Sequence, residues 1–154
     1  MTLESIKAIA VSLLTWINVN TEYKLPPEII PEIHIIPASE VQDMVCGKPC
    51  PAYAWITEKA DKIYLSDILK VDKDVCDRTI LLHELIHFAQ RKTNKFASSP
   101  LEERRHLMEM NAIIIQNIYL AEHGRRLIYK NGYAVRGLGT VSYTHLTLPT
   151  ILLV

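Results

Sequence analysis

The stretch LLHELIHFAQ, residues 81–90, holds two histidines four positions apart, with a glutamate directly after the first. If this stretch is helical, His83 and His87 lie one turn apart on the same face, because an α-helix has 3.6 residues per turn. At that spacing, two imidazole nitrogens can both reach one zinc ion. Glu84 projects about 100° around the helix, where it can take a proton from an attacking water and later give it to a leaving amine. The stretch therefore predicts a zinc-binding catalytic helix.

The residues around the motif predict that this helix is buried on one side. Its apolar members are Ile80, Leu81, Leu85, Ile86 and Phe88. Burying two imidazoles and a carboxylate among them is unfavourable unless they find partners, and a metal ion would be one. The alternative is a core helix whose histidines bond to backbone carbonyls.

A catalytic zinc site usually takes three protein ligands and keeps one position open, so a third ligand is needed. The downstream candidates are Glu102, Glu103, His106, Glu109, Glu122 and His123. Glu109 lies in the apolar stretch LMEMNAIII, residues 107–115, where a carboxylate needs a cationic partner. Glu102 and Glu103 lie in the first turn of the predicted helix, where they complement its dipole. We therefore expect Glu109 to be the third ligand, with an ion pair to Arg105 as the alternative.

The sequence HELIH, residues 83–87, followed by EMNAIIIQNIYL, residues 109–120, resembles the gluzincin-type zincin metallopeptidases. The likeness is to small bacterial HExxH proteins in particular, and it covers most of residues 10–123. It implies a His-His-Glu zinc site, Glu84 as general base, and hydrolysis of a peptide or protein substrate. A zinc-binding module without turnover and a metal-free helical interaction protein are the rival functions.

This chain departs from the family pattern in two respects. Position 113 is isoleucine, where thermolysin-like enzymes place an acid that supports the zinc ligands. No oxyanion-stabilising residue can be assigned, and the candidates are Tyr119, His123, Tyr129 and Tyr133.

Residues 1–139 predict one α+β domain, in which a small antiparallel sheet packs on the HExxH helix and the helix that bears Glu109. We expect helices at 4–18, 39–47, 74–92 and 101–123, a strand at 32–37, and a β-hairpin formed by 52–58 and 62–67. Ser39 and Ser99 are the expected N-caps of the second and fourth helices, with Pro100 at the first helical position. One hairpin strand would be the edge along which an extended substrate lies.

The composition predicts a soluble protein. Lys+Arg and Asp+Glu number 17 each, so no overall positive field attracts nucleic acid. The apolar stretch at 6–19 carries Lys7 and is too short to span a bilayer, and it lacks the basic region of a signal peptide. A periplasmic or secreted location stays open if the natural chain begins earlier, and the oligomeric state is not fixed by the sequence.

The segment CGKPC, residues 46–50, can close a small loop. A disulfide between Cys46 and Cys50 and a pair of free thiols are equally compatible with it. A zinc knuckle would need a second Cys or His pair, and none is nearby.

The segment VSYTHLTLPT, residues 141–150, resembles the translation of a sequencing-library adapter. We therefore expect residues 140–154 to be a non-native tail, so that His145 is not a ligand and the natural C-terminus is missing. The alternative is a natural strand-like tail.

Deleting residues 141–154 is expected to change the free energy of unfolding by no more than about 0.5 kcal/mol, because a segment without evolved contacts contributes little. Zinc content should also stay unchanged. Thermal unfolding and metal analysis of the shortened chain check this, and a clear fall in melting temperature would show that the tail packs on the domain.

Overall fold

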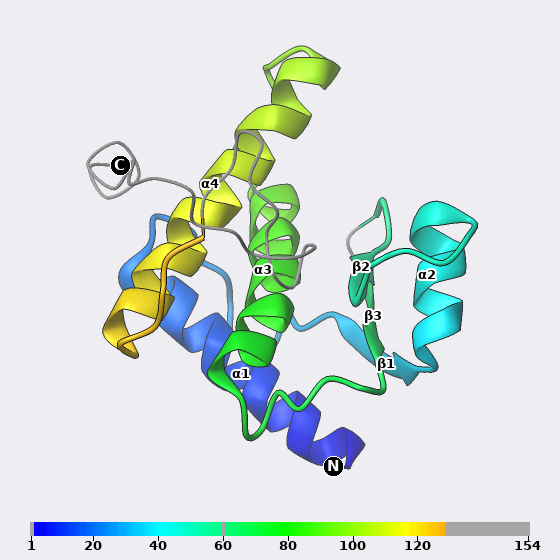
Figure 1. The fold of residues 1–154 in the computed structure, drawn as a ribbon. Helices are drawn as coiled ribbons and strands as arrows, with labels where there is room; N and C mark the ends of the chain where they lie inside the picture. The colour runs from blue at the N-terminus through cyan, green and yellow to red at the C-terminus, as the bar shows by residue number, and fades with distance from the viewer. Residues whose placement is uncertain (1, 60, 129–154) are drawn as a thin grey trace.

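The computed structural model describes residues 2–59 and 61–128 and shows an α+β domain, as expected (Figure 1). Its elements are α1 (Leu3–Asn20), β1 (Glu32–Ile36), α2 (Ala38–Cys46), β2 (Ala54–Ile56), β3 (Lys62–Ser66), α3 (Val75–Lys92) and α4 (Leu101–Glu122). The tail at 140–154, the domain end at 139, and Tyr129, Tyr133 and His145 lie outside the described residues.

The three strands form one sheet in the order β1-β3-β2. β2 and β3 pair antiparallel as the predicted hairpin, but β1 pairs with β3 in parallel. The expected antiparallel sheet is therefore a mixed one, because α2 and β2 intervene between β1 and β3 and return the chain in the same direction. β3 is central, so residues 62–67 are not an edge; of the two hairpin strands, β2 is the edge strand.

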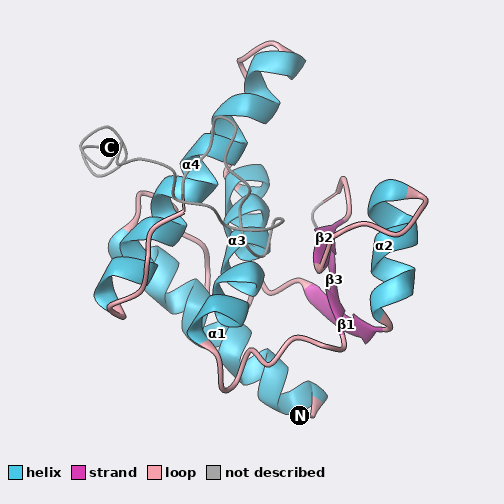
Figure 2. Ribbon diagram, in the orientation of Figure 1, coloured by secondary structure: helices cyan, strands magenta, loops and turns pink. Residues whose placement is uncertain are grey.

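Helix α3 lies between the sheet and the other long helices (Figures 1 and 2). α2 packs on the sheet, α1 packs on α3 and β1, and α4 packs on α3. α3 and α4 run antiparallel, since Gln90 near the end of α3 bonds to Met108, whereas Thr79 near its start bonds to Gln116. This pairing brings the middle of α4 beside the HExxH motif.

α3 begins where the sequence predicts. Asp74 is its N-cap, and its carboxylate accepts hydrogen bonds from the backbone N–H groups of Cys76 (2.8 Å) and Asp77 (3.2 Å). From Thr79 to Gln90 every residue except His87 is buried. The helix is thus nearly enclosed by the domain, which explains the apolar residues around its polar trio.

The two expected serine caps are wrong. The N-cap positions of α2 and α4 are Pro37 and Pro100, and neither helix has a side-chain cap. Each proline instead offers its carbonyl to the first turn: Pro37 accepts from Val41 (3.3 Å) and Pro100 from Arg104 (2.7 Å). Proline pre-sets the backbone just before a helix, so Ser39 lies inside α2, and α4 begins one residue after Pro100.

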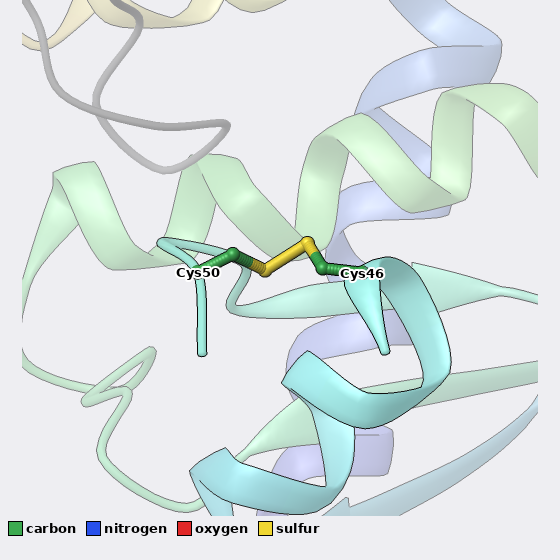
Figure 3. Close-up of a disulfide and its surroundings, with 2 residues drawn as sticks. All are labelled: Cys46 and Cys50. Atoms are coloured by element: carbon green, nitrogen blue, oxygen red, sulfur yellow. A yellow bond between two sulfur atoms is a disulfide. The ribbon is translucent and has the colours of Figure 1, made fainter. Parts of the chain in front are cut away.

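Cys46 and Cys50 form a disulfide (Figure 3). It joins the last residue of α2 to the segment that leads into β2, around Gly47, whose φ of +69° is left-handed. Of the two possibilities left open by the sequence, the structure has the disulfide. Cys76 is a free thiol.

Candidate metal centre

Three predicted ligands meet between α3 and α4. His83 Nε2 lies 2.8 Å from Glu109 Oε1 and 3.0 Å from His87 Nε2, and His87 Nε2 lies 4.0 Å from Glu109 Oε2. All three ligand atoms fall within 4.8 Å of one another, so the group could hold one metal ion. The helix spacing supplies the two histidines, and the antiparallel packing of α4 supplies the carboxylate.

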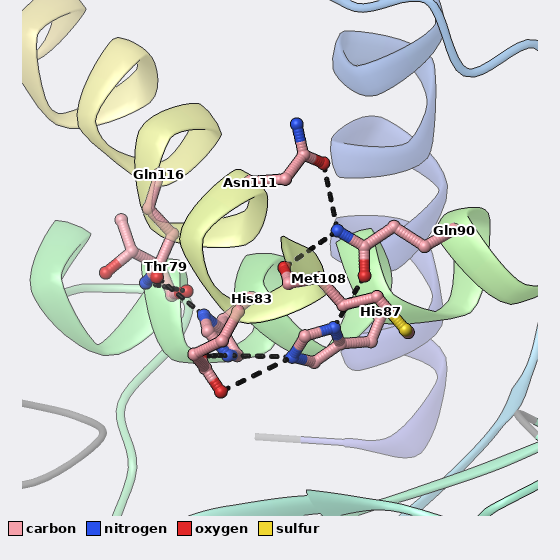
Figure 4. Close-up of polar contacts among 8 residues, drawn as sticks. Thr79, His83, His87, Gln90, Met108, Asn111 and Gln116 are labelled. Carbon is pink, nitrogen blue, oxygen red and sulfur yellow. Dashed lines mark hydrogen bonds and ion pairs between the residues drawn. The ribbon is translucent and has the colours of Figure 1, made fainter. Parts of the chain in front are cut away.

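Gln116 fixes the orientation of the His83 ring (Figure 4). Its Nε2 donates to the Thr79 carbonyl at 2.9 Å, and a carbonyl can only accept. The Oε1 atom must therefore face His83 Nδ1, 2.6 Å away. That contact requires a proton on Nδ1, which in the neutral ring leaves the Nε2 lone pair directed at the ligand cluster.

Gln90 fixes the orientation of the His87 ring in the same way. Its Nε2 donates to the Met108 carbonyl at 2.9 Å, and its Oε1 lies 2.8 Å from His87 Nδ1 (Figure 4). Gln90 Nε2 also donates to Asn111 Oδ1 at 2.9 Å, and the Tyr23 hydroxyl donates to the same oxygen at 2.5 Å. The buried amide is thus held from three sides, and His87 also presents its Nε2 lone pair to the cluster.

The electrostatics of the cluster suit a cation. Burial opposes a charge on His83, but the adjacent Glu109 carboxylate outweighs it and raises the pKa of His83. Burial lowers the pKa of His87 to about 4, and the neighbouring His83 adds to this effect. Two imidazole nitrogens and a carboxylate oxygen that converge as acceptors repel one another unless a proton or a metal ion lies between them. The donor set therefore fits a divalent cation.

Glu84 lies beside the ligands on α3 and is only 7% exposed. Burial raises the pKa of its carboxyl to about 7, an effect that the nearby His83 partly offsets. Its Oε2 atom is buried and has no hydrogen-bond partner among the residues that the structure describes. A buried carboxylate with an unused acceptor is uncommon in a folded core and is typical of a functional site.

The other candidate ligands do not join the cluster. Glu102, Glu103 and His106 are exposed on the first turns of α4. Glu122 instead accepts a hydrogen bond from Trp16 Nε1 at 2.8 Å, and His123 Nδ1 contacts the Tyr119 carbonyl at 2.8 Å. Glu109 is therefore the one downstream candidate that meets both histidines.

The oxyanion candidates among the described residues lie elsewhere. The Tyr119 hydroxyl contacts Arg78 at 3.4 Å, and its ring packs against Trp16. Tyr119 follows Glu109 by ten residues along α4, a distance of roughly 15 Å along the axis. His123 lies farther still, so neither reaches the cluster.

Sequence reasoning missed the roles of Gln90 and Gln116. Both appear in the sequence as polar residues at buried positions of otherwise apolar helices, which was an available signal. Their spacing identifies their targets: Gln90 follows His87 by three residues, on the same helix face. Gln116 could be assigned only with α4 packed on α3.

Comparisons of the chain with family models, with curated proteins and with solved structures return no match. Within the described ranges, no helix combines the length and the apolar character needed to cross a bilayer.

Replacing Gln116 with leucine is expected to weaken zinc binding by about 10- to 100-fold, because His83 loses the partner that fixes its ring. Zinc affinity measured by competition with a chromogenic chelator tests this, with the melting temperature recorded alongside. Gln42→Leu on α2 is the matched control and should bind zinc as the wild type does. Unchanged affinity in a folded Gln116→Leu protein would contradict the positioning role.

Proposed function

We propose that this protein is a zinc-dependent peptidase in which His83, His87 and Glu109 hold the metal and Glu84 is the general base. The observation that carries the proposal is the convergence of the three ligand atoms within 4.8 Å, next to a buried glutamate with an unused oxygen. The resemblance of residues 83–87 and 109–120 to gluzincins supports it independently of the geometry.

The donor set favours zinc. Two imidazole nitrogens and one carboxylate oxygen are a known ligand set of catalytic zinc, which keeps a further position open. Bound there, a zinc ion would act as a Lewis acid that polarises the scissile carbonyl and makes water more acidic. Because Gln90 and Gln116 fix both imidazoles, the protein residues alone pre-organise the site.

Glu84 has the geometry of a proton carrier. Glu84 follows His83 directly on α3, so its side chain is rotated by about 100° around the helix axis. It therefore lies beside the three proposed ligands without occupying a ligand position itself. Its free oxygen can accept the proton of an attacking water and return it to the leaving amine. A site with a purely structural metal would have no use for such a side chain.

The edge strand β2 is suited to hold an extended substrate. Thr57 N donates to Lys62 O at 3.0 Å, so by the alternation of antiparallel pairs Ala54 and Ile56 direct their backbone groups to the other edge. No described strand pairs with that edge. Arg91 of α3 donates to the Thr57 carbonyl at 2.7 Å and so holds the end of β2 beside α3, the helix that carries His83 and His87. A peptide added to β2 would therefore run close to the cluster.

A mixture of peptides of diverse sequence tests this function. The wild type with one equivalent of zinc should produce new N-termini that are absent with the Glu84→Gln protein. If both proteins bind zinc and neither cleaves, the second candidate function holds: a zinc-binding module without turnover.

A further inference from the structure

A cavity of about 540 Å³ opens next to the metal centre. The end of α3, the loop at 93–100, the start of α4 and the turn after β2 form its walls. Gln90 and Met108 line it, and these two residues also form the network behind His87. The cavity therefore begins about one helical turn, roughly 5 Å, beyond His87.

The charge of this cavity is strongly positive. Lys59, Arg91, Arg104 and Arg105 line it, against the single carboxylate of Glu58. None of the four basic side chains forms an ion pair with a carboxylate in the described part of the chain. The positive charge is thus not used to neutralise an acidic group of the fold.

The arginines differ in how firmly the fold holds them. Arg91 donates to Thr57 O at 2.7 Å, and Arg104 donates to the carbonyls of Ala97 and Ser99 at 2.9 Å each. The Nε atom of Arg104 is buried without a hydrogen-bond partner among the described residues. Arg105 makes no hydrogen bond or ion pair with any described residue and is exposed. Arg105 thus keeps its donors exposed to a ligand, and Arg104 keeps one donor that is unpaired but buried.

We propose that this cavity is a substrate subsite that binds a carboxylate of the peptide, a proposal that rests on the proposed peptidase function. Guanidinium groups pair with carboxylates through directed, charge-assisted hydrogen bonds. Phe96, Leu101 and Met108 supply apolar surface for the aliphatic part of the ligand.

The subsite lies close to the scissile bond. A peptide extended along β2 continues past Glu58 and Lys59, which follow that strand and line the cavity. An extended chain advances about 3.3 Å per residue, so the carboxylate belongs to a residue one or two positions from the scissile bond. It comes either from an Asp or Glu side chain or from the peptide C-terminus.

Binding to the zinc-supplemented Glu84→Gln protein tests the proposal without turnover. Three N-acetylated pentapeptides serve as probes: acetyl-Ala-Ala-Glu-Ala-Ala-amide, its Gln counterpart, and acetyl-penta-alanine with a free C-terminus. We expect a carboxylate peptide to bind about tenfold more tightly than the Gln peptide, as one charge-assisted contact supplies. NMR titration should show the shifts at the amides of Arg91, Asn94 and Ala97. Tight binding of the Glu peptide or of the free C-terminus identifies the source of the carboxylate.

Arg105 provides the decisive variants, because the described fold does not use its side chain. Arg105→Gln should reduce the preference for the carboxylate peptide to about twofold, and Arg105→Glu should abolish it. Arg125→Gln, the same change at an exposed arginine beyond the end of α4, should leave it intact. Equal affinity for charged and neutral peptides, binding of none of them, or a preference that survives both Arg105 changes would overturn the subsite.

The outcomes separate this proposal from the peptidase function. If the wild type binds the carboxylate peptide with the Arg105 dependence but never cleaves any peptide, the subsite stands and hydrolysis fails. If the wild type cleaves peptides without regard to charge, hydrolysis stands and the subsite fails.

Discussion

Glu84→Gln is expected to lower kcat/KM for peptide cleavage by about 10²- to 10⁴-fold, the contribution of a general base. Zinc content should stay at one equivalent, because Glu84 is not among the three converging ligands. The amide keeps the shape of the side chain and removes a buried charge, so the melting temperature should not fall. Peptide cleavage and metal content, measured on the same preparation, check both parts.

Glu103→Gln is the matched control, since Glu103 is exposed on the first turn of α4. It should cleave as fast as the wild type. If the Glu84→Gln protein retained more than about a tenth of the activity, another group would be the base.

His83→Ala and His87→Ala are each expected to weaken zinc binding by more than the roughly 100-fold that loss of an outer partner produces. Each change removes one of three ligands and leaves a glutamine without its imidazole partner. After dialysis against a chelator, both variants should contain no zinc.

His106→Ala is the control for the histidine variants, because His106 is exposed and outside the cluster. It should retain a full equivalent of zinc after the same dialysis. A folded His87→Ala protein that also retained one would contradict the assigned site.

The sequence was sufficient to predict that His83, His87 and Glu109 lie close together, because their placement depends on helix periodicity and on one short connection. The spacing of His83 and His87 places them on one face, and the loop at 93–100 forces α4 to return beside α3. Glu109 follows from that register as the carboxylate of α4 that can meet both rings, and the structure confirms that the three residues converge.

The strand pairing was harder to predict because it depends on long-range contacts. The hairpin of β2 and β3 is local, and its prediction was correct. The parallel pairing of β1 with β3 joins Glu32 to Lys62 across an intervening helix and strand, and nothing in either short stretch specifies its direction. The position of β2 at the edge follows only from that pairing.

The roles of the residues that orient His83 and His87 were also hard to predict, because they depend on how α3 and α4 pack together. Position 113 is an isoleucine, 3% exposed, where the family resemblance leads one to seek an acid. In this chain two amides, Gln90 and Gln116, orient the histidines instead, each anchored by a backbone carbonyl of the opposite helix. A neutral amide performs this task without adding a further carboxylate to a site that already contains Glu84 and Glu109.

The zinc content of the wild type and of Glu109→Ala, measured by native mass spectrometry, tests the central claim most directly. The account predicts one zinc per wild-type chain, none in the Glu109→Ala protein, and one in the Glu102→Ala control, whose side chain is exposed. A wild type that binds no zinc, or a Glu109→Ala protein that binds it normally while Glu102→Ala does not, would contradict the His83, His87 and Glu109 site.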